Sequence, residues 1–291
     1  MALGFIFGCA STPTPGRTPD LPPSRGDTTS TPIIVQPIGM LPASSFLYRD
    51  GTYVYDLRQT TVVTVGNDSL TRMDDTLVTT GLLSYTFRSS NDTLMVVGVI
   101  DSLSVASTRE TGAPLRQLAA PVTIDLRPGA VDSLQVPPDS TTPSPNCDTM
   151  EDAARALARD VYVRVPRGVQ RGQRWSDSTS TAVCRGGIPM TATTRAIFEA
   201  RDVQSRGDTT IVQVLRRSTL TLNGAGVQGS RRIAVSGTGT SETLFTYDLR
   251  AGAFLESTGQ STLRLRFETI QQTEEVTQRS TSWVRLRPRA P

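Results

Sequence analysis

The chain of 291 residues contains no histidine and no lysine, so all 30 of its basic residues are arginine. Without these two residue types, the chain cannot supply a Ser-His-Asp or Cys-His relay, a Ser-Lys dyad, a Schiff base or a histidine-ligated metal site. Much ordinary enzyme chemistry is therefore excluded. We expect a protein that is not an enzyme and holds no cofactor or metal.

Aromatic residues are also scarce, at 5% of the chain, and hydrophobic residues reach only 37%. Threonine, serine and valine are abundant instead. The β-branched residues among them favour half-buried strands over helices. The composition therefore predicts an all-β fold, whose strands carry one apolar and one polar face.

Cysteine is rare, and the first of the three lies at the end of a short apolar run. Leu3 to Gly8 lead directly into Cys9, with Ile6 three residues before the cysteine and the small Gly8 just before it. This pattern resembles a bacterial lipoprotein signal, which implies lipidation of Cys9. It departs from that pattern in lacking a basic region before the apolar run. The alternative is an apolar terminus with no targeting role.

If Cys9 is lipidated, the resemblance implies anchoring to the outer membrane, because the following Ala10 and Ser11 provide no acidic retention signal. The chain would then face the periplasm or the cell surface. In such an oxidising compartment, Cys147 and Cys184 are expected to form a disulfide. Two buried free thiols are the alternative.

Five segments follow from composition and periodicity. They are a lipoprotein-type signal over 1–9, a disordered tether rich in Pro, Thr and Ser over 10–45, an N-terminal β half over 46–136, a Pro-rich linker with a helix over 137–160, and a C-terminal β half over 161–288. The hairpins over 82–105 and 193–222 have similar patterns, which suggests two related halves. Whether these halves share one sheet stays open.

Strand alternation is clearest where large apolar residues occupy every second position. Such sets are Tyr53, Tyr55 and Leu57; Leu83, Tyr85 and Phe87; Phe245, Tyr247 and Leu249; and Leu263, Leu265 and Phe267. Asn67-Asp68, Asn91-Asp92 and Gly207-Asp208 predict turns between strands. One helix is predicted near 148–159, where Met150, Ala153, Ala154 and Leu157 share a face that would cover the sheet.

Charge is distributed unevenly, since residues 1–150 hold 9 Arg and 14 acidic residues, net −5, and residues 151–291 hold 21 and 13, net +8. The arginines of the basic half alternate with apolar residues, as solvent-facing strand positions do, so we expect no nucleic-acid partner. Gly224, Gly226 and Gly229 match a dinucleotide fingerprint, but a strand rather than a helix follows them. They predict a glycine-rich hairpin.

Three segments carry a wider resemblance: Gly172-Gln173-Arg174-Trp175, the hairpin over 193–222, and the run from Phe245 to Gly252. Together they resemble uncharacterised bacterial envelope lipoproteins with a curved half-barrel sheet, and more distantly periplasmic lipoprotein carriers whose half-barrel holds acyl chains. The resemblance implies an antiparallel curved sheet or half-barrel with one covering helix, binding a lipid or other hydrophobic ligand. The alternative is an envelope scaffold without a cavity, which binds an envelope protein.

Overall fold

The computed structural model describes residues 49–66, 73–90, 93–108, 116–128, 134–135, 149–166, 168–185, 188–207, 209–228 and 231–288. Strands dominate these residues. They are β1 (Gly51–Val65), β2 (Met73–Ser90), β3 (Thr93–Ser107), β4 (Arg116–Gln117), β5 (Val122–Pro128), β6 (Leu134–Gln135), β7 (Arg174–Arg185), β8 (Ile188–Arg206), β9 (Thr209–Gln228), β10 (Arg231–Asp248), β11 (Ala253–Glu268) and β12 (Thr273–Leu286). The predicted all-β class is confirmed.

All the described strands belong to a single 12-stranded sheet with the order β6-β5-β3-β2-β1-β12-β11-β10-β9-β8-β7, and β4 pairs with β3 beside this path. The first long strand pairs antiparallel with the last, with Tyr55 opposite Leu286 and Val65 opposite Val276. The strands before and after the helix therefore share one continuous sheet. Across this seam, Arg287 Nη2 donates a hydrogen bond to Asp56 Oδ1 at 2.6 Å.

The alternation of side chains decides which face of the sheet is buried. Along β1, the residues at 53, 55, 57, 59, 61 and 63 are buried, while Arg58 and Val62 are exposed. Because successive side chains of a strand point to opposite faces, the large apolar residues of β1 line one face together. The same periodicity holds for Leu83 and Tyr85 in β2. The sequence therefore placed the core face correctly.

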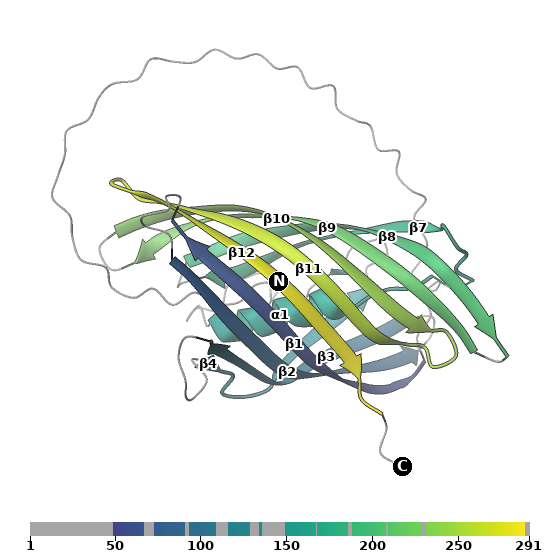
Figure 1. Ribbon diagram of the computed structural model, residues 1–291. Helices are drawn as coiled ribbons and strands as arrows, with labels where there is room; N and C mark the ends of the chain where they lie inside the picture. Colours follow the sequence, from purple (N-terminus) through teal and green to yellow (C-terminus); the bar gives the residue numbers. More distant parts are fainter. Residues whose placement is uncertain are drawn as a thin grey trace, which may run out of the picture.

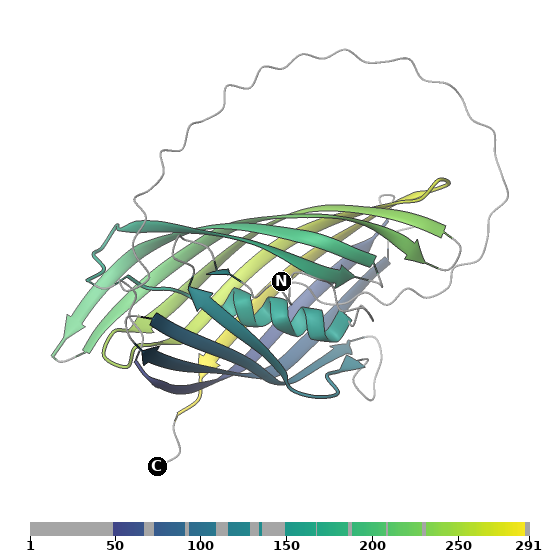
Figure 2. The ribbon, with the colours of Figure 1, turned by 180° about the vertical axis from the view of Figure 1, so that it is seen from behind.

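The sheet curls around the single described helix, α1 (Thr149–Val161), to form a half-barrel (Figures 1 and 2). The helix contacts β3 and β5 near one end of the sheet and β7 at the other end. Figure 2 shows it lying on the concave face, in the opening between these two ends. The predicted curved sheet with one covering helix is confirmed.

The helix is buried through the residues that the sequence predicted. Met150, Ala153, Ala154 and Leu157 all lie in the core, and alanines let the helix approach the sheet closely. On its other side, Arg155 Nη2 lies 3.1 Å from Glu151 Oε2 one turn earlier. Residue 148, where the predicted helix begins, lies outside the described residues, and the helix ends two residues later than predicted.

Antiparallel strands flank each of the predicted turns, between β1 and β2, β2 and β3, and β8 and β9. The turn after β10 shows why a glycine is needed there. Gly252 has a φ of +66°, and a Cβ at this position would lie 2.7 Å from the backbone nitrogen of Arg49. Asp248 Oδ1 accepts the amide of Arg250 at 2.7 Å, which fixes the start of the same turn. Among the described residues, no helix is long and apolar enough to cross a membrane.

Candidate site on the concave face

One part of the concave face is filled by aromatic rings, which we call the aromatic region. Its members are Tyr53, Tyr55, Tyr85, Phe87, Tyr162, Phe245, Tyr247 and Phe254, all of them buried. Tyr55 stacks on Phe254 with ring centroids 4.1 Å apart, and Phe245 meets Phe254 edge-on at 5.9 Å. Large rings in contact leave little free volume, so this region forms a solid core.

Across the middle of the same face, small hydroxyl residues occupy matching positions on five neighbouring strands. They are Ser218, Ser241, Ser261, Ser280 and Thr61, consecutive partners in the ladder from β9 to β1, and we call them the hydroxyl row. Ser218 and Ser241 hydroxyls are 2.5 Å apart, and those of Thr61 and Ser280 are 2.8 Å apart. Two members of the row, Ser218 and Ser241, line a space under the helix.

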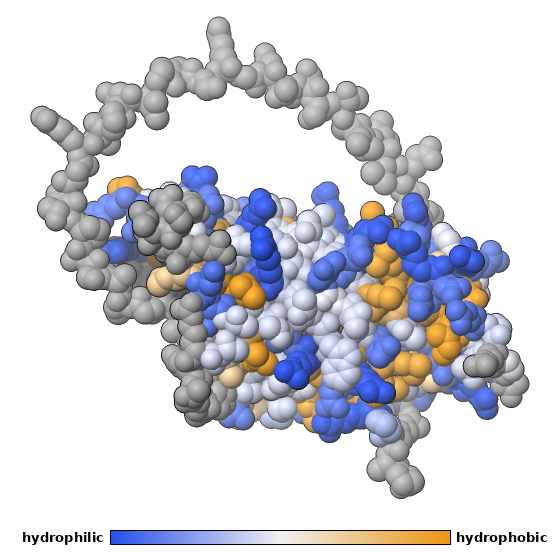
Figure 3. All heavy atoms as spheres, viewed as in Figure 1, coloured by the Kyte–Doolittle hydropathy of each residue, from blue (hydrophilic) through white to orange (hydrophobic). Residues whose placement is uncertain are grey.

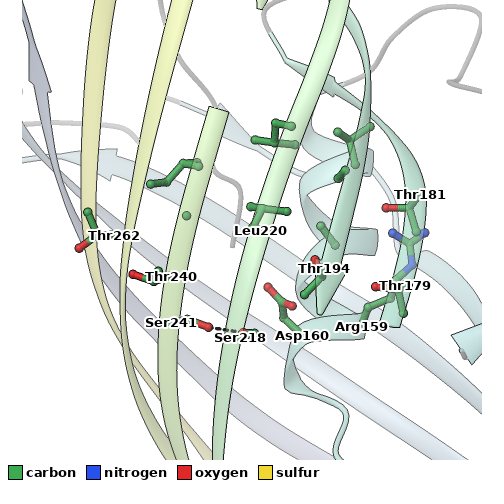
Figure 4. Close-up of a pocket in the computed structure, with 16 residues that line it drawn as sticks. Arg159, Asp160, Thr179, Thr181, Thr194, Ser218, Leu220, Thr240, Ser241 and Thr262 are labelled. Carbon is green, nitrogen blue, oxygen red and sulfur yellow. Dashed lines mark hydrogen bonds between the residues drawn. The ribbon is translucent and has the colours of Figure 1, made fainter. Parts of the chain in front are cut away.

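A cavity of about 70 Å³ lies between α1 and the inner face of β7 to β11, beginning at this row (Figure 4). One part of its wall is polar, formed by Thr179, Thr181, Thr194, Ser218 and Ser241. Another part is apolar, formed by Val183, Ala192, Leu220, Leu222 and Leu263. The cavity therefore presents two kinds of surface to anything that enters it.

Two charged residues at the end of α1 also line the cavity, Arg159 and Asp160 (Figure 4). Burial lowers the pKa of Arg159 to about 10, while the neighbouring Asp160 carboxylate opposes that shift, so the guanidinium stays positive at neutral pH. Its Nε is buried and has no hydrogen-bond partner among the residues that the structure describes. The polar wall thus offers both donors and acceptors.

Arg216 of β9 lies buried on the concave face, next to the hydroxyl row. One Nη donates to the backbone carbonyl of Asp160 and the other to Thr243 Oγ1 at 3.3 Å, and the guanidinium lies 5.3 Å from the centre of the Phe245 ring. Burial lowers the pKa of Arg216, opposed mainly by Asp160. The side chain therefore joins the end of the helix to the sheet at the boundary between the two regions.

Two further contacts hold the same end of the helix. The hydroxyl of Tyr85 donates to the backbone carbonyl of Ala158, and burial raises the pKa of that phenol well above its usual value, so it remains a donor. Just beyond the helix, Arg164 Nη2 lies 2.9 Å from Asp177 Oδ2 of β7 in a buried ion pair. The carboxyl-terminal end of α1 is therefore firmly attached.

The polar groups that line the cavity are hydroxyls, one guanidinium and one carboxylate. The cavity hydroxyls have no imidazole or amine beside them, because the chain contains neither histidine nor lysine. No group of three potential metal ligands occurs among the described residues. What remains is a set of hydrogen-bonding groups next to an aliphatic wall, an arrangement typical of sites that orient an amphiphilic ligand.

The residues that the sequence analysis singled out have different outcomes. Cys9 and Cys147 lie outside the described residues, so lipidation and the disulfide stay predictions. The backbone of Cys184 lies in β7, opposite Pro189 of β8. Gly224 and Gly226 lie inside β9, which pairs with β10, in agreement with the predicted hairpin.

Sequence reasoning missed Arg216 and the hydroxyl row. A signal for Arg216 was present, because it shares the alternating positions of Val212, Val214 and Leu222, all of which are buried. An arginine at one of the alternating positions that are otherwise apolar indicates that its side chain points toward the buried face of the sheet. The hydroxyl row had no such signal, because its serines come from four different strands and align only through the register.

Comparison with known proteins does not assign this chain to a family. No protein-family model and no curated protein matches the chain. A solved structure, described as the crystal structure of Acinetobacter baumannii OccAB4, aligns with 82% of this chain and 98% of that chain at 6% sequence identity and a TM-score of 0.20. A similarity at that level does not support a shared fold.

Proposed function

We propose that this protein is a cell-envelope lipoprotein that binds a lipid or another hydrophobic ligand inside its half-barrel. The observation that carries the proposal is the cavity under α1, which has an aliphatic wall and a hydroxyl wall. An acyl chain or similar group would lie along Leu220, Leu222 and Leu263. The polar end of the same molecule would meet Arg159 and the cavity hydroxyls.

The size of the cavity sets a condition on binding. Pockets that hold small ligands usually enclose about 300–1,000 Å³. The cavity measures about 70 Å³, which is room for a few water molecules. A lipid would therefore enter only if α1 moves away from the sheet. Because Tyr85 and Arg216 hold the carboxyl-terminal end, we expect the amino-terminal end of α1 to move first.

A second candidate function rests on the edge of the sheet. The strand β7 ends the sheet order, is 12 residues long and pairs with β8 on one side only among the described strands. Such an edge can accept a strand from another protein. This arrangement favours an envelope scaffold, which would bind a protein through β7 and need no ligand in the cavity.

Native mass spectrometry of the full chain carrying Cys9→Ser tests the first function, because this substitution removes the proposed anchor. After expression in a periplasm, we expect a fraction whose mass exceeds that of the polypeptide by one lipid, which organic extraction recovers. A protein with no bound mass, which also gains none when purified lipids are added, would contradict ligand binding. A co-purifying protein would then favour the scaffold.

The anchor needs its own test. We expect the unsubstituted chain to incorporate a metabolic fatty-acid label and to fractionate with the outer membrane, and the Cys9→Ser variant to do neither. Equal labelling of the two chains would show that Cys9 is not the lipidated residue.

A further inference from the structure

A second hollow, on the opposite face of the sheet, is much larger than the cavity. This outer groove has a volume of about 880 Å³ and crosses β8, β9, β10, β11, β12 and β1. Figure 3 shows the outer face of these strands, which is mostly pale and blue, with orange side chains gathered toward the right of the view. A strongly twisted sheet is saddle-shaped, so its outward face can be hollow along the strands.

The side chains in the outer groove form a row set by the strand register. Across the sheet, the row reads Arg195, Thr219, Thr240, Thr262, Arg279 and Val62, each residue opposite the next. Three threonine hydroxyls thus lie between two arginines. With about 4.8 Å between neighbouring strands, the two arginine positions are about 19 Å apart.

The positive charge in the outer groove is not neutralised by the protein. Neither Arg195 nor Arg279 forms an ion pair with an acidic residue among those that the structure describes. The third arginine of the lining, Arg217, lies 2.9 Å from Glu242, the one acidic residue of the lining. The groove therefore carries a net charge of +2, concentrated at its two ends, which favours an elongated anionic ligand.

The spacing of the charges points to the class of ligand. Single-stranded nucleic acid and polyphosphate carry a charge on every unit, and nucleic-acid sites usually provide aromatic rings for stacking. The groove separates its free cations by a run of hydroxyls, and its lining contains no aromatic residue. Acidic polysaccharides match this pattern, since anionic groups alternate with hydroxyl-bearing stretches. A flat lipid surface would not reach into a groove.

We propose that the outer groove binds a segment of an acidic polysaccharide, with Arg195 and Arg279 pairing two carboxylates of the chain and the threonine row binding its hydroxyls. The outer groove lies on the opposite face of the sheet from the cavity under α1, and Thr240 and Thr262 border both. In an envelope protein, it would hold the domain against a charged glycan while the half-barrel carries its own ligand.

Isothermal titration of the full chain with a hyaluronan hexamer, which carries a carboxylate on every second sugar, tests the proposal, with maltohexaose as the neutral probe. We expect saturable binding of the acidic hexamer, at least tenfold tighter than that of the neutral one, which weakens when salt is raised from 50 to 300 mM. The double variant Arg195→Gln/Arg279→Gln should weaken binding of the acidic probe at least tenfold.

A matched control changes two arginines elsewhere on the sheet. Arg231 and Arg232 are exposed at the start of β10, about 30 and 26 Å along the strand from Thr240 at about 3.3 Å per residue. Their double glutamine variant should change the affinity less than twofold. Thr240→Val, which removes a hydroxyl but keeps the shape, should weaken binding severalfold without changing its salt dependence.

Three results would overturn the proposal: no preference for the acidic hexamer, equal affinity of the Arg195→Gln/Arg279→Gln variant, or tighter arginine-dependent binding of polyphosphate or single-stranded DNA. Thermal unfolding of each variant excludes misfolding as the cause of lost binding.

Discussion

The aromatic region and the hydroxyl row lie on the same face of the same sheet, yet they use that face differently. In the first, Tyr55, Tyr247 and Phe254 fill the concave face with buried rings, and Tyr55 stacks on Phe254. In the second, the serines of β9 and β10, Ser218 and Ser241, line a cavity. Since strand spacing is the same in both, side-chain volume decides where the half-barrel is solid and where it is hollow.

This comparison predicts that stability resides in the aromatic region. The largest expected effect is for Phe245→Ala, which should lower the free energy of unfolding by about 3–5 kcal/mol because it opens a void in a solid core. Leu220→Ala beside the existing cavity should cost less than about 2 kcal/mol, since its side chain has fewer neighbours. Urea unfolding measures both. Equal losses would show that the two regions are packed alike.

The arginine at the boundary should matter through its inward contacts. Arg216→Met keeps most of the side-chain volume but removes the donor to the Asp160 carbonyl and one of the positive charges near the Asp160 carboxylate, so we expect a loss of about 3 kcal/mol. Its neighbour Arg217 provides the matched control, because it is exposed and pairs with Glu242 on the outer face of the sheet. Arg217→Met should cost less than about 1 kcal/mol in the same experiment.

The tyrosine that holds the helix should have an intermediate effect. Tyr85→Phe removes one hydroxyl and leaves the buried carbonyl of Ala158 without this donor, at a cost of about 1–2 kcal/mol. Hydrogen exchange at the amides of α1 should become faster, while the strands distant from it stay protected. Unchanged exchange in α1 would show that this contact does not hold the helix.

The smallest effect should come from the seam between β1 and β12, outside both regions. Hydrogen bonds from Arg287 hold the pKa of Asp56 below its ordinary value of 3.8. The folded state therefore favours the ionised Asp56 carboxylate. The stabilisation that this carboxylate gives to the folded state is present above about pH 3.8 and is lost as the pH falls through the lower folded pKa. Asp56→Asn should remove this part of the acid dependence. The free energy of unfolding of the parent chain and of Asp56→Asn, measured from pH 5 to pH 2, would show the same pH dependence if the Asp56–Arg287 pair contributes nothing.

Much of the fold could be predicted because it depends on local alternation. Tyr53, Tyr55 and Leu57 repeat with the strand period, and each lies in the core. The helix was predictable for the same reason, since Ala153, Ala154 and Leu157 follow the helical period and have no competing strand pattern. Turns between strands were marked by Asn-Asp and Gly-Asp pairs, which tolerate the required backbone conformations.

The candidate site was not predictable to the same extent because it depends on register. Ser218 and Ser280 are far apart in the chain and look like ordinary solvent-facing residues until β9 to β12 are aligned. The outer groove has the same origin, since Arg195 and Arg279 share a row only after four strand pairings. A single sequence specifies periodicity within each strand, but it does not specify which residues of distant strands become neighbours.

A fluorescence titration with cis-parinaric acid tests the central claim most directly, using a matched pair of variants in the full chain with Cys9→Ser. Ala192→Leu adds bulk inside the cavity, and Thr191→Leu adds similar bulk on the exposed side of the same strand. We predict that the parent chain and the Thr191→Leu variant bind the fatty acid saturably with similar affinity. The affinity of the Ala192→Leu variant should be at least tenfold weaker, and the stability of both variants should change little. Absence of saturable binding by the parent, or equal affinity of all three chains, would contradict a ligand site under α1.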